Sequence, residues 1–397
     1  MFLTREEERI LAGEEGEAKA RALRVVVKVG EALGARRLVP IKHAHISGVS
    51  FENIGEPGVE FIEGFAELGA RFSVPTSVNP VSYDTEDLSS IPGLQLSPEY
   101  VRWQERALKA LAKMGAEMEL TCTPYYADIP QRYGLRAGDH VAWGESSAVA
   151  YGNSVLGIRS NREGGPLALA AAIVGRTYYY GMHIEEERRP RVEYVVEGEL
   201  EEAEAGMLGE TIALSHKDPR PPLVRASFSS DAALREFLAA ISTAGDLAMA
   251  YVPGITPEEE GGEVRERVTI ERAQIEEALR RRSPPGEVDF VYIGCPHASL
   301  RELKEFLAGL EGRKRGAKLV ISMSRSVYLE ALREGVLGRA LQLGTAVVKD
   351  SCLVVSPFYK FNKGASLVTN SFKAYSYLSR RGVKVYMART RELAEYL

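Results

Sequence analysis

Apolar runs alternate with helix-like segments in the last third of the chain. The apolar runs predict strands at 288–294, 318–324, 345–350 and 382–388. Apolar residues recur at helical spacing in the segments 299–310, 326–335 and 390–397. Strands that alternate with helices are typical of a parallel sheet with helices packed on it. We therefore expect an α/β unit in this part of the chain.

The first half shows a similar alternation with longer polar segments. A capping box between Thr4 and Glu7, and helical spacing that stops at Gly34, predict a helix pair at the start. Ser97 followed by proline predicts the start of another helix, which should end near Gly115. Short apolar runs predict strands at 37–41, 71–74 and 117–122, and long polar loops are expected at 42–58 and 75–88.

These patterns predict a multidomain α/β fold with mostly parallel sheets. We expect boundaries near 185 and 285, so that the domains span 1–185, 186–285 and 286–397 and interleave in space. The segment 186–230 has mixed strand and loop character, and we assign it no role.

Composition narrows the classes of function. The 50 basic and 55 acidic residues are mixed along the chain and give a net charge of -5, so no broad cationic surface for nucleic acid is expected. No apolar run approaches the roughly 18 residues of a membrane span, and the acidic N-terminus does not resemble a secretory signal. We therefore expect a cytoplasmic protein with neither a nucleic-acid nor a membrane partner.

Three widely spaced cysteines are the main candidates for chemistry. An odd number of cysteines cannot close a disulfide framework and suits a reducing compartment. Cys122, Cys295 and Cys352 each fall at the carboxyl end of a predicted strand, and such ends line the ligand crevice of open α/β sheets. We therefore expect the three thiols to converge on a metal site. For any single cysteine, the alternative is simple packing as a small apolar side chain.

The number of thiols bears on the kind of metal. Structural zinc normally has four Cys or His ligands, often in C-x-x-C pairs, and the chain contains no such pair. Three thiolates can hold an iron-sulfur cubane that leaves one iron open to substrate as a Lewis acid, which is the chemistry of a hydro-lyase. A zinc-stabilised α/β enzyme is therefore disfavoured. A non-catalytic iron-sulfur sensor that binds a partner through the cluster remains an alternative.

Six segments occur in the order found in one protein family. They are 42–58 (KHAHISGVSFENIGEPG), 74–84, 121–126, 143–165, 294–299 and 350–357. In this order they resemble the large subunit of the aconitase X family, over most of the chain. The resemblance implies an aconitase-like fold with a 4Fe-4S cluster in the crevice between domains. It also implies that the cluster ligands are Cys122, Cys295 and Cys352.

Within that family, the chain most resembles the archaeal members that dehydrate (R)-5-phosphomevalonate to trans-anhydromevalonate 5-phosphate in a mevalonate route to isoprenoids. The resemblance implies a separate small subunit, and hence a heterodimer or a higher assembly. It also implies that the catalytic base lies on the small subunit, so the large subunit alone should be inactive. Bacterial relatives dehydrate cis-3-hydroxy-L-proline, which is the alternative substrate.

Dehydration of a 3-hydroxy acid also needs groups that bind the substrate's anionic parts. The glycine turn after 46 offers the backbone N–H groups of Gly48, Val49 and Ser50, together with the Ser50 hydroxyl. Asn79 precedes a proline and is therefore held extended, which would direct its amide and the nearby Ser82 hydroxyl toward the crevice.

Two predicted helix starts hold further candidates for substrate binding, which are Glu145, Ser146, Ser147, Asn370, Ser371 and Lys373. Free N–H groups and a cation at a helix start suit a phosphate or a carboxylate, although capping of the helix explains at least one of the first three. Among the histidines, His45 is a candidate to hydrogen-bond the substrate or to order the cluster edge. We interpret His183 and His297 as structural.

Overall fold

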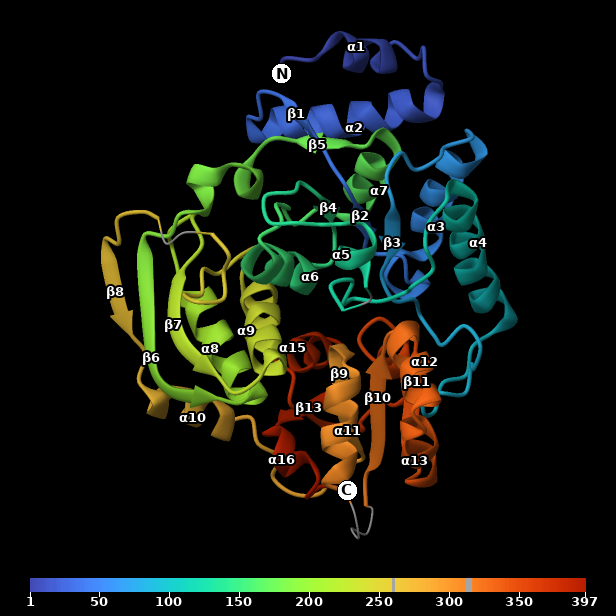
Figure 1. The fold of residues 1–397 in the computed structure, drawn as a ribbon. Helices are drawn as coiled ribbons and strands as arrows, with labels where there is room; N and C mark the ends of the chain where they lie inside the picture. Colours follow the sequence, from blue (N-terminus) through green and yellow to red (C-terminus); the bar gives the residue numbers. More distant parts are fainter. Residues whose placement is uncertain (127, 259–260, 311–315) are drawn as a thin grey trace.

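Parallel sheets dominate the computed structural model, which describes residues 1–126, 128–258, 261–310 and 316–397. Within these residues three sheets are parallel throughout, and a fourth is an antiparallel pair of short strands. Figure 1 shows three groups of elements around a common centre, which are the N-terminal part in blue to teal, the middle part in green to yellow and the C-terminal part in orange to red. This arrangement confirms the predicted α/β class.

The N-terminal part opens with the predicted helix pair. α1 (Arg5–Leu11) begins at the Thr4 capping box, and α2 (Glu17–Leu33) ends where Gly34 adopts a left-handed conformation. The other elements of this part are β1 (Leu38–Pro40), β2 (Ala44–Ile46), α3 (Phe51–Glu67), β3 (Thr76–Val78), α4 (Pro98–Met114), α5 (Ile129–Arg132), β4 (Ala142–Trp143), α6 (Ser146–Tyr151), the π-helical turn η1 (Gly152–Leu156), α7 (Gly165–Val174) and β5 (Arg176–Tyr178). Ser97 caps α4 as predicted.

Two strand predictions for this part are wrong. No strand forms at 71–74, and 117–122 makes only an isolated bridge between Glu117 and Ser77. The central sheet is instead built from β2, β3 and β4, in the order β3-β2-β4, and the first two come from segments predicted to be polar loops. These strands have three residues or fewer, and their buried polar side chains satisfy one another, as His45 and Ser77 do at 2.7 Å. A buried strand of this kind looks like a loop in sequence.

The middle part is a second parallel sheet with two long helices. Its elements are the 3-10 turns η2 (Gly181–His183) and η3 (Glu185–Arg188), then β6 (Val192–Leu200), α8 (Glu202–Ser215), β7 (Leu223–Phe228), α9 (Asp231–Ala244), β8 (Glu266–Thr269) and α10 (Arg272–Arg280), with strand order β7-β6-β8. The segment left unassigned at 186–230 thus supplies β6, α8 and β7. α9 extends to the centre of the molecule, where it lies close to α6 and α15 (Figure 1).

The C-terminal part is the α/β unit expected from the sequence. Its elements are β9 (Phe290–Ala298), α11 (Leu300–Ala308), β10 (Lys318–Met323), α12 (Arg325–Arg333), α13 (Val336–Gln342), β11 (Ala346–Lys349), α14 (Phe358–Phe361), β12 (Ser366–Thr369), α15 (Phe372–Arg380), β13 (Lys384–Met387) and α16 (Thr390–Leu393). The five parallel strands run in the order β11-β10-β9-β12-β13. The apolar pattern does not predict β12, because only Leu367 and Val368 of its four residues are apolar.

The N-terminal and C-terminal parts are joined by buried polar contacts. The backbone N–H of Val81 donates to the carbonyl of Asp350 at 2.9 Å, and the buried Lys349 ammonium pairs with Asp84 at 2.9 Å. These contacts lie next to Cys352 and so connect the two parts beside a candidate ligand. Across the described ranges, no helix combines the length and apolarity needed to cross a membrane.

Close packing of α8 on α9 generates the first prediction. A Cβ added at Gly209 would come within 2.6 Å of the Ala240 Cβ and 2.7 Å of the Phe237 carbonyl oxygen. Gly209→Ala should therefore lower the free energy of unfolding by about 1–3 kcal/mol through overpacking. The measurement is thermal or denaturant unfolding. Gly64→Ala in α3, where the new Cβ meets nothing within 4 Å, is the matched control and should stabilise the protein slightly. Equal stability of the Gly209→Ala variant and the parent would contradict the packing.

Candidate active site

All three cysteines line one cavity where the N-terminal and C-terminal parts meet. The cavity has a volume of about 330 Å³, and Cys122, Cys295 and Cys352 all contribute to its wall. The predicted convergence of the cysteines is therefore present. The expectation that each cysteine lies at the carboxyl end of a strand holds only for Cys352, which follows β11. Cys122 lies in an irregular segment, and Cys295 lies within the span of β9.

The three thiols are free, buried and close enough to influence one another. Burial raises the pKa of Cys122 to about 12 and also raises the pKa of Cys352. Burial raises the pKa of Cys295 as well, and the two neighbouring sulfurs raise it further. Thiols in such surroundings become thiolates when a positively charged metal centre coordinates them. Without such a centre the raised pKa values keep the thiols protonated at neutral pH, which argues against a free thiolate nucleophile.

The donor set fits a cluster better than a single ion. In the part of the chain that the structure describes, no three His, Cys, Asp or Glu side chains converge closely enough to hold one metal ion. A cluster has several irons, so its thiolate ligands lie farther apart than the ligands of one ion. The backbone N–H of His297 donates to the Cys122 Sγ at 3.2 Å, and the N–H groups of Val354 and Val355 donate to Cys352. Such hydrogen bonds to sulfur are typical of iron-sulfur sites.

A buried ion pair forms another wall of the cavity. The Lys373 ammonium contacts the Glu145 carboxylate, and it also donates to the Ser147 hydroxyl at 3.1 Å. Burial alone would raise the pKa of Glu145, but Lys373 and the Asn79 amide outweigh burial and lower this pKa to about 2. Burial would likewise lower the pKa of Lys373, and the Glu145 charge instead raises it well above its usual value. Both groups are therefore charged at neutral pH.

A chain of hydrogen bonds leads from this ion pair into the central sheet. Asn79 donates its amide N–H to Glu145 at 2.8 Å, and its carbonyl oxygen lies 2.9 Å from the Nε2 atom of His45. On its other side, the Nδ1 atom of His45 lies 2.7 Å from the Ser77 hydroxyl. Burial lowers the pKa of His45 to about 4, so this imidazole is neutral. His45 stands behind Asn79 and orients it, but it does not itself line the cavity.

The predicted substrate residues divide into two groups. Five of them line the cavity with the cysteines, and these are Gly48, Asn79, Glu145, Ser146 and Lys373. Gly48 has a φ of 64°, which is the left-handed conformation that glycine adopts without strain. The remaining six do not line it, and these are Val49, Ser50, Ser82, Ser147, Asn370 and Ser371.

Most residues of the second group support the wall from behind. The Ser50 hydroxyl donates to the carbonyl of Val355, and the Ser82 hydroxyl donates to the buried side chain of Gln104 at 2.9 Å. The same Gln104 amide donates to the carbonyl of Val49 at 2.9 Å. Ser371 caps α15, as the predicted helix start implied, and its hydroxyl donates to the carbonyl of Cys295.

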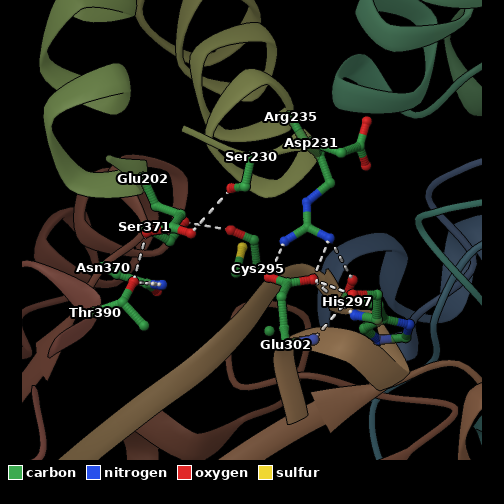
Figure 2. A network of polar contacts seen from close by, with 12 residues as sticks. Glu202, Ser230, Asp231, Arg235, Cys295, His297, Glu302, Asn370, Ser371 and Thr390 are labelled. Carbon is green, nitrogen blue, oxygen red and sulfur yellow. Dashed lines mark hydrogen bonds and ion pairs between the residues drawn. The ribbon is translucent and has the colours of Figure 1, made fainter. Parts of the chain in front are cut away.

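Asn370 faces a second cavity, on the other side of the β12–α15 turn. This cavity has a volume of about 560 Å³ and lies between the middle and C-terminal parts. Asn370 donates to the Thr390 hydroxyl at 2.9 Å, and Thr390 in turn donates to Glu202 at 2.8 Å (Figure 2). Asn370 therefore lines this second cavity and not the cavity that contains the cysteines.

Several wall residues were not found from sequence. They are Ser47, Asn53, Pro80, Gly144, Arg162, Val354, Val355, Tyr377 and Arg381. Arg381 donates to the Val354 carbonyl at 2.6 Å and to the Asn53 side chain at 2.8 Å, so a cation at the end of α15 is held against the wall. The polar segments 42–58, 143–165 and 350–357 contain most of these residues. Tyr377 lies on α15 and Arg381 directly follows it, and this helix has ordinary amphipathic spacing.

Comparison with known proteins assigns most of this chain to one family. Residues 1–186 match the model described as aconitase X first domain, residues 189–280 the second domain, and residues 288–397 the third domain. The chain is 56% identical to the phosphomevalonate dehydratase large subunit of Aeropyrum pernix over 98% of both chains. It is 38% identical to the protein of the same name from Methanosarcina mazei, over 95% of this chain and 92% of that one.

Two further relatives bear on substrate and fold. A cis-3-hydroxy-L-proline dehydratase of Pseudomonas aeruginosa is 33% identical over 93% of this chain but only 65% of its own length. The crystal structure of Thermococcus kodakaraensis aconitase X in its holo-form matches with a TM-score of 0.90 and 36% identity, covering 100% of this chain and 99% of that one. The family models span most of the sequence and the relatives match it at nearly full length, so the chain belongs to the aconitase X family.

Proposed function

We propose that this chain is the large subunit of a phosphomevalonate dehydratase, a hydro-lyase that converts (R)-5-phosphomevalonate to trans-anhydromevalonate 5-phosphate. The observation that carries the proposal is one cavity whose wall joins three buried cysteines to a buried carboxylate–ammonium pair. Its support is the 56% identity, over 98% of both chains, to a protein of that name. The hydroxyproline dehydratases are less similar and much longer chains, so the hydroxyproline substrate is the weaker alternative.

The cofactor that the site would hold is a 4Fe-4S cluster on Cys122, Cys295 and Cys352. When bound through three thiolates, such a cluster leaves one iron without a protein ligand, and that iron supplies Lewis-acid chemistry. The support is that three buried free thiols line one cavity and that backbone N–H groups point at two of them.

The residues of this chain have the task of binding and orienting the substrate. Lys373 is the buried cation of the wall, and the pairing with Glu145 fixes its position, so its remaining N–H can bind a substrate carboxylate. The backbone at Gly48 and the hydroxyl of Ser146 add hydrogen-bond donors nearby. Val354 and Val355 contribute apolar wall that keeps water from the reacting atoms.

Neither of the two candidate bases in this chain is well placed to take the proton next to the substrate carboxylate. Glu145 is a weak base because its pKa is about 2 and its oxygens accept from Lys373 and Asn79. His45 stands behind Asn79 and does not line the cavity. We therefore propose that a separate small subunit brings the base to the cavity, in a cytoplasmic heterodimer or higher assembly. The relatives named as large subunits support this partner.

An anaerobic assay tests the proposal. The chain is co-expressed with its candidate small subunit and assayed for dehydration of 5-phosphomevalonate, with cis-3-hydroxy-L-proline as the competing substrate. Each of Cys122→Ser, Cys295→Ser and Cys352→Ser should abolish turnover and lower bound iron, because loss of one ligand leaves the cluster incompletely held. Iron and sulfide content, absorbance and EPR are the measurements.

The outcomes of that assay separate the parts of the proposal. Turnover of hydroxyproline alone would overturn the proposed substrate, and iron binding without turnover of either compound would favour an iron-sulfur sensor. Absence of iron in the parent protein would overturn the cofactor. The large subunit assayed alone should be inactive, and turnover without the small subunit would overturn the proposed location of the base.

Removing the buried cation should affect the chemical step. Lys373→Met keeps the length of the side chain and removes its charge, so kcat/KM should fall by about 100- to 1,000-fold, the usual cost of one buried donor to a developing anion. Steady-state kinetics measure this loss. Lys360→Met, at an exposed lysine that pairs with Glu52, is the matched control and should leave kcat/KM unchanged. A normal rate in the Lys373→Met variant would remove Lys373 from the site.

Neutralising the carboxylate of the ion pair should change the pH profile. In Glu145→Gln, Lys373 loses the charge that raises its pKa, and the remaining burial lowers this pKa. The ammonium then loses its proton at a lower pH than in the parent. The alkaline limb of the kcat/KM profile should therefore move to lower pH, and an unchanged limb would contradict the coupling.

A further inference from the structure

His297 contacts the loops of all three cysteines, although the chemistry above gives it no task. Its backbone N–H donates to the Cys122 Sγ at 3.2 Å. Its Nδ1 atom lies 3.2 Å from the hydroxyl of Thr121, and its Nε2 atom lies 3.1 Å from the carbonyl oxygen of Ser351. His297 itself follows Cys295 by two residues. One fully buried side chain therefore joins the residues that immediately precede two cysteines to the strand that carries the third.

The partners of the imidazole define which nitrogen carries the proton. The carbonyl oxygen of Ser351 can only accept, so Nε2 must be the N–H donor. In the neutral ring Nδ1 is then an acceptor, and the Thr121 hydroxyl donates to it. Thr121 in turn accepts from the backbone N–H of Thr123 at 3.0 Å. Both ring nitrogens are thus satisfied, and each holds a different cysteine loop.

The middle part of the chain holds the same residue from the other side. Arg235 of α9 is buried and donates to the carbonyl oxygen of His297 at 3.3 Å. Its guanidinium also binds both oxygens of Glu302, at 2.8 and 2.5 Å, and Figure 2 shows this pair directly beside His297. Glu302 lies in the first turn of α11, which follows β9. His297 is therefore linked by hydrogen bonds to the N-terminal, middle and C-terminal parts.

We propose that His297 is a positioning residue that holds the three cysteine loops at the spacing needed for cluster binding. The inference rests on the proposed function, because it takes Cys122, Cys295 and Cys352 to be the ligands. His297 would act through the loops and through its backbone N–H on Cys122, without contacting the substrate. Residues that orient metal ligands typically change metal affinity or activity by about 10- to 100-fold when they are replaced.

Conservative variants can separate the two side-chain links. His297→Gln places an amide N–H near the former Nε2 position and can keep the bond to Ser351. His297→Asn places polar atoms near the former Nδ1 position and can keep the bond to Thr121. Thr121→Val removes the hydroxyl at nearly constant volume and leaves the imidazole in place. His297→Ala removes both links, and His183→Gln, at another fully buried histidine, is the matched control.

The experiment reconstitutes each full-length variant anaerobically with iron and sulfide. Iron and sulfide per chain, the rate of iron release to a chelator, the EPR spectrum and the reduction potential are measured, and melting of the apoprotein serves as the control for folding. We expect iron release to accelerate about 10-fold or more in His297→Ala and less in the Gln, Asn and Thr121→Val variants. The reduction potential should fall in His297→Ala, because a displaced N–H no longer stabilises charge on the Cys122 sulfur. The His183→Gln variant should retain the parent's cluster.

Three results would overturn the inference. If the His297→Gln, His297→Asn and Thr121→Val variants fold and show the parent's iron release, EPR spectrum and potential, the residue has no positioning role. If iron release changes only in proportion to the melting temperature of the apoprotein, and does so equally in His183→Gln, the role is purely structural. If the parent itself takes up no cluster, the proposed cofactor fails and this inference fails with it. The three results are distinguishable within one set of samples.

Discussion

Three thiols that lie far apart along the chain have to be buried together, and most of the architecture depends on this constraint. Cys122 comes from the N-terminal part, whereas Cys295 and Cys352 come from the C-terminal sheet. Burial raises the pKa of each thiol, so the arrangement is stable either as neutral thiols or as thiolates that a metal centre compensates. The polar contacts around Asp84, Lys349 and Asp350 hold the two parts in register next to the third cysteine.

The middle part provides no cysteine, yet it is packed against the two parts that do. α9 lies between α6 and α15, the two helices whose starts carry Glu145 and Lys373. Its Arg235 is buried in a two-oxygen contact with Glu302, a geometry in which the desolvated guanidinium keeps its charge. A buried pair of this kind defines position more than it adds stability. At Gly209, α8 packs closely against α9 and so supports the helix that carries Arg235.

The sequence predicted the C-terminal sheet well because β9 and β10 are buried on both faces and therefore appear as continuous apolar runs. It failed for β2 and β3, where His45 and Ser77 are buried but polar, and for β12, where only Leu367 and Val368 are apolar. Polar loop segments located most of the site, including Gly48, Asn79 and Glu145. The sequence could not distinguish residues that line the cavity from those that support it, because the hydroxyls of Ser50 and Ser82 bind Val355 and Gln104, contacts that only the folded chain creates. Asn370 and Lys373 show the same limit. They lie three positions apart at the start of α15, yet they line two different cavities.

The separation of the cysteines along the chain also has a consequence for biosynthesis. Cys352 follows Cys122 by 230 residues. At a translation rate of roughly 5–20 residues per second, Cys122 leaves the ribosome roughly 10–50 seconds before the last thiol is made. The N-terminal sheet can fold in that interval, but the cavity cannot close, because its opposite wall does not yet exist. Insertion of the proposed cluster would therefore be a late event that awaits almost the whole chain, and a nascent chain halted before β11 would carry exposed thiols.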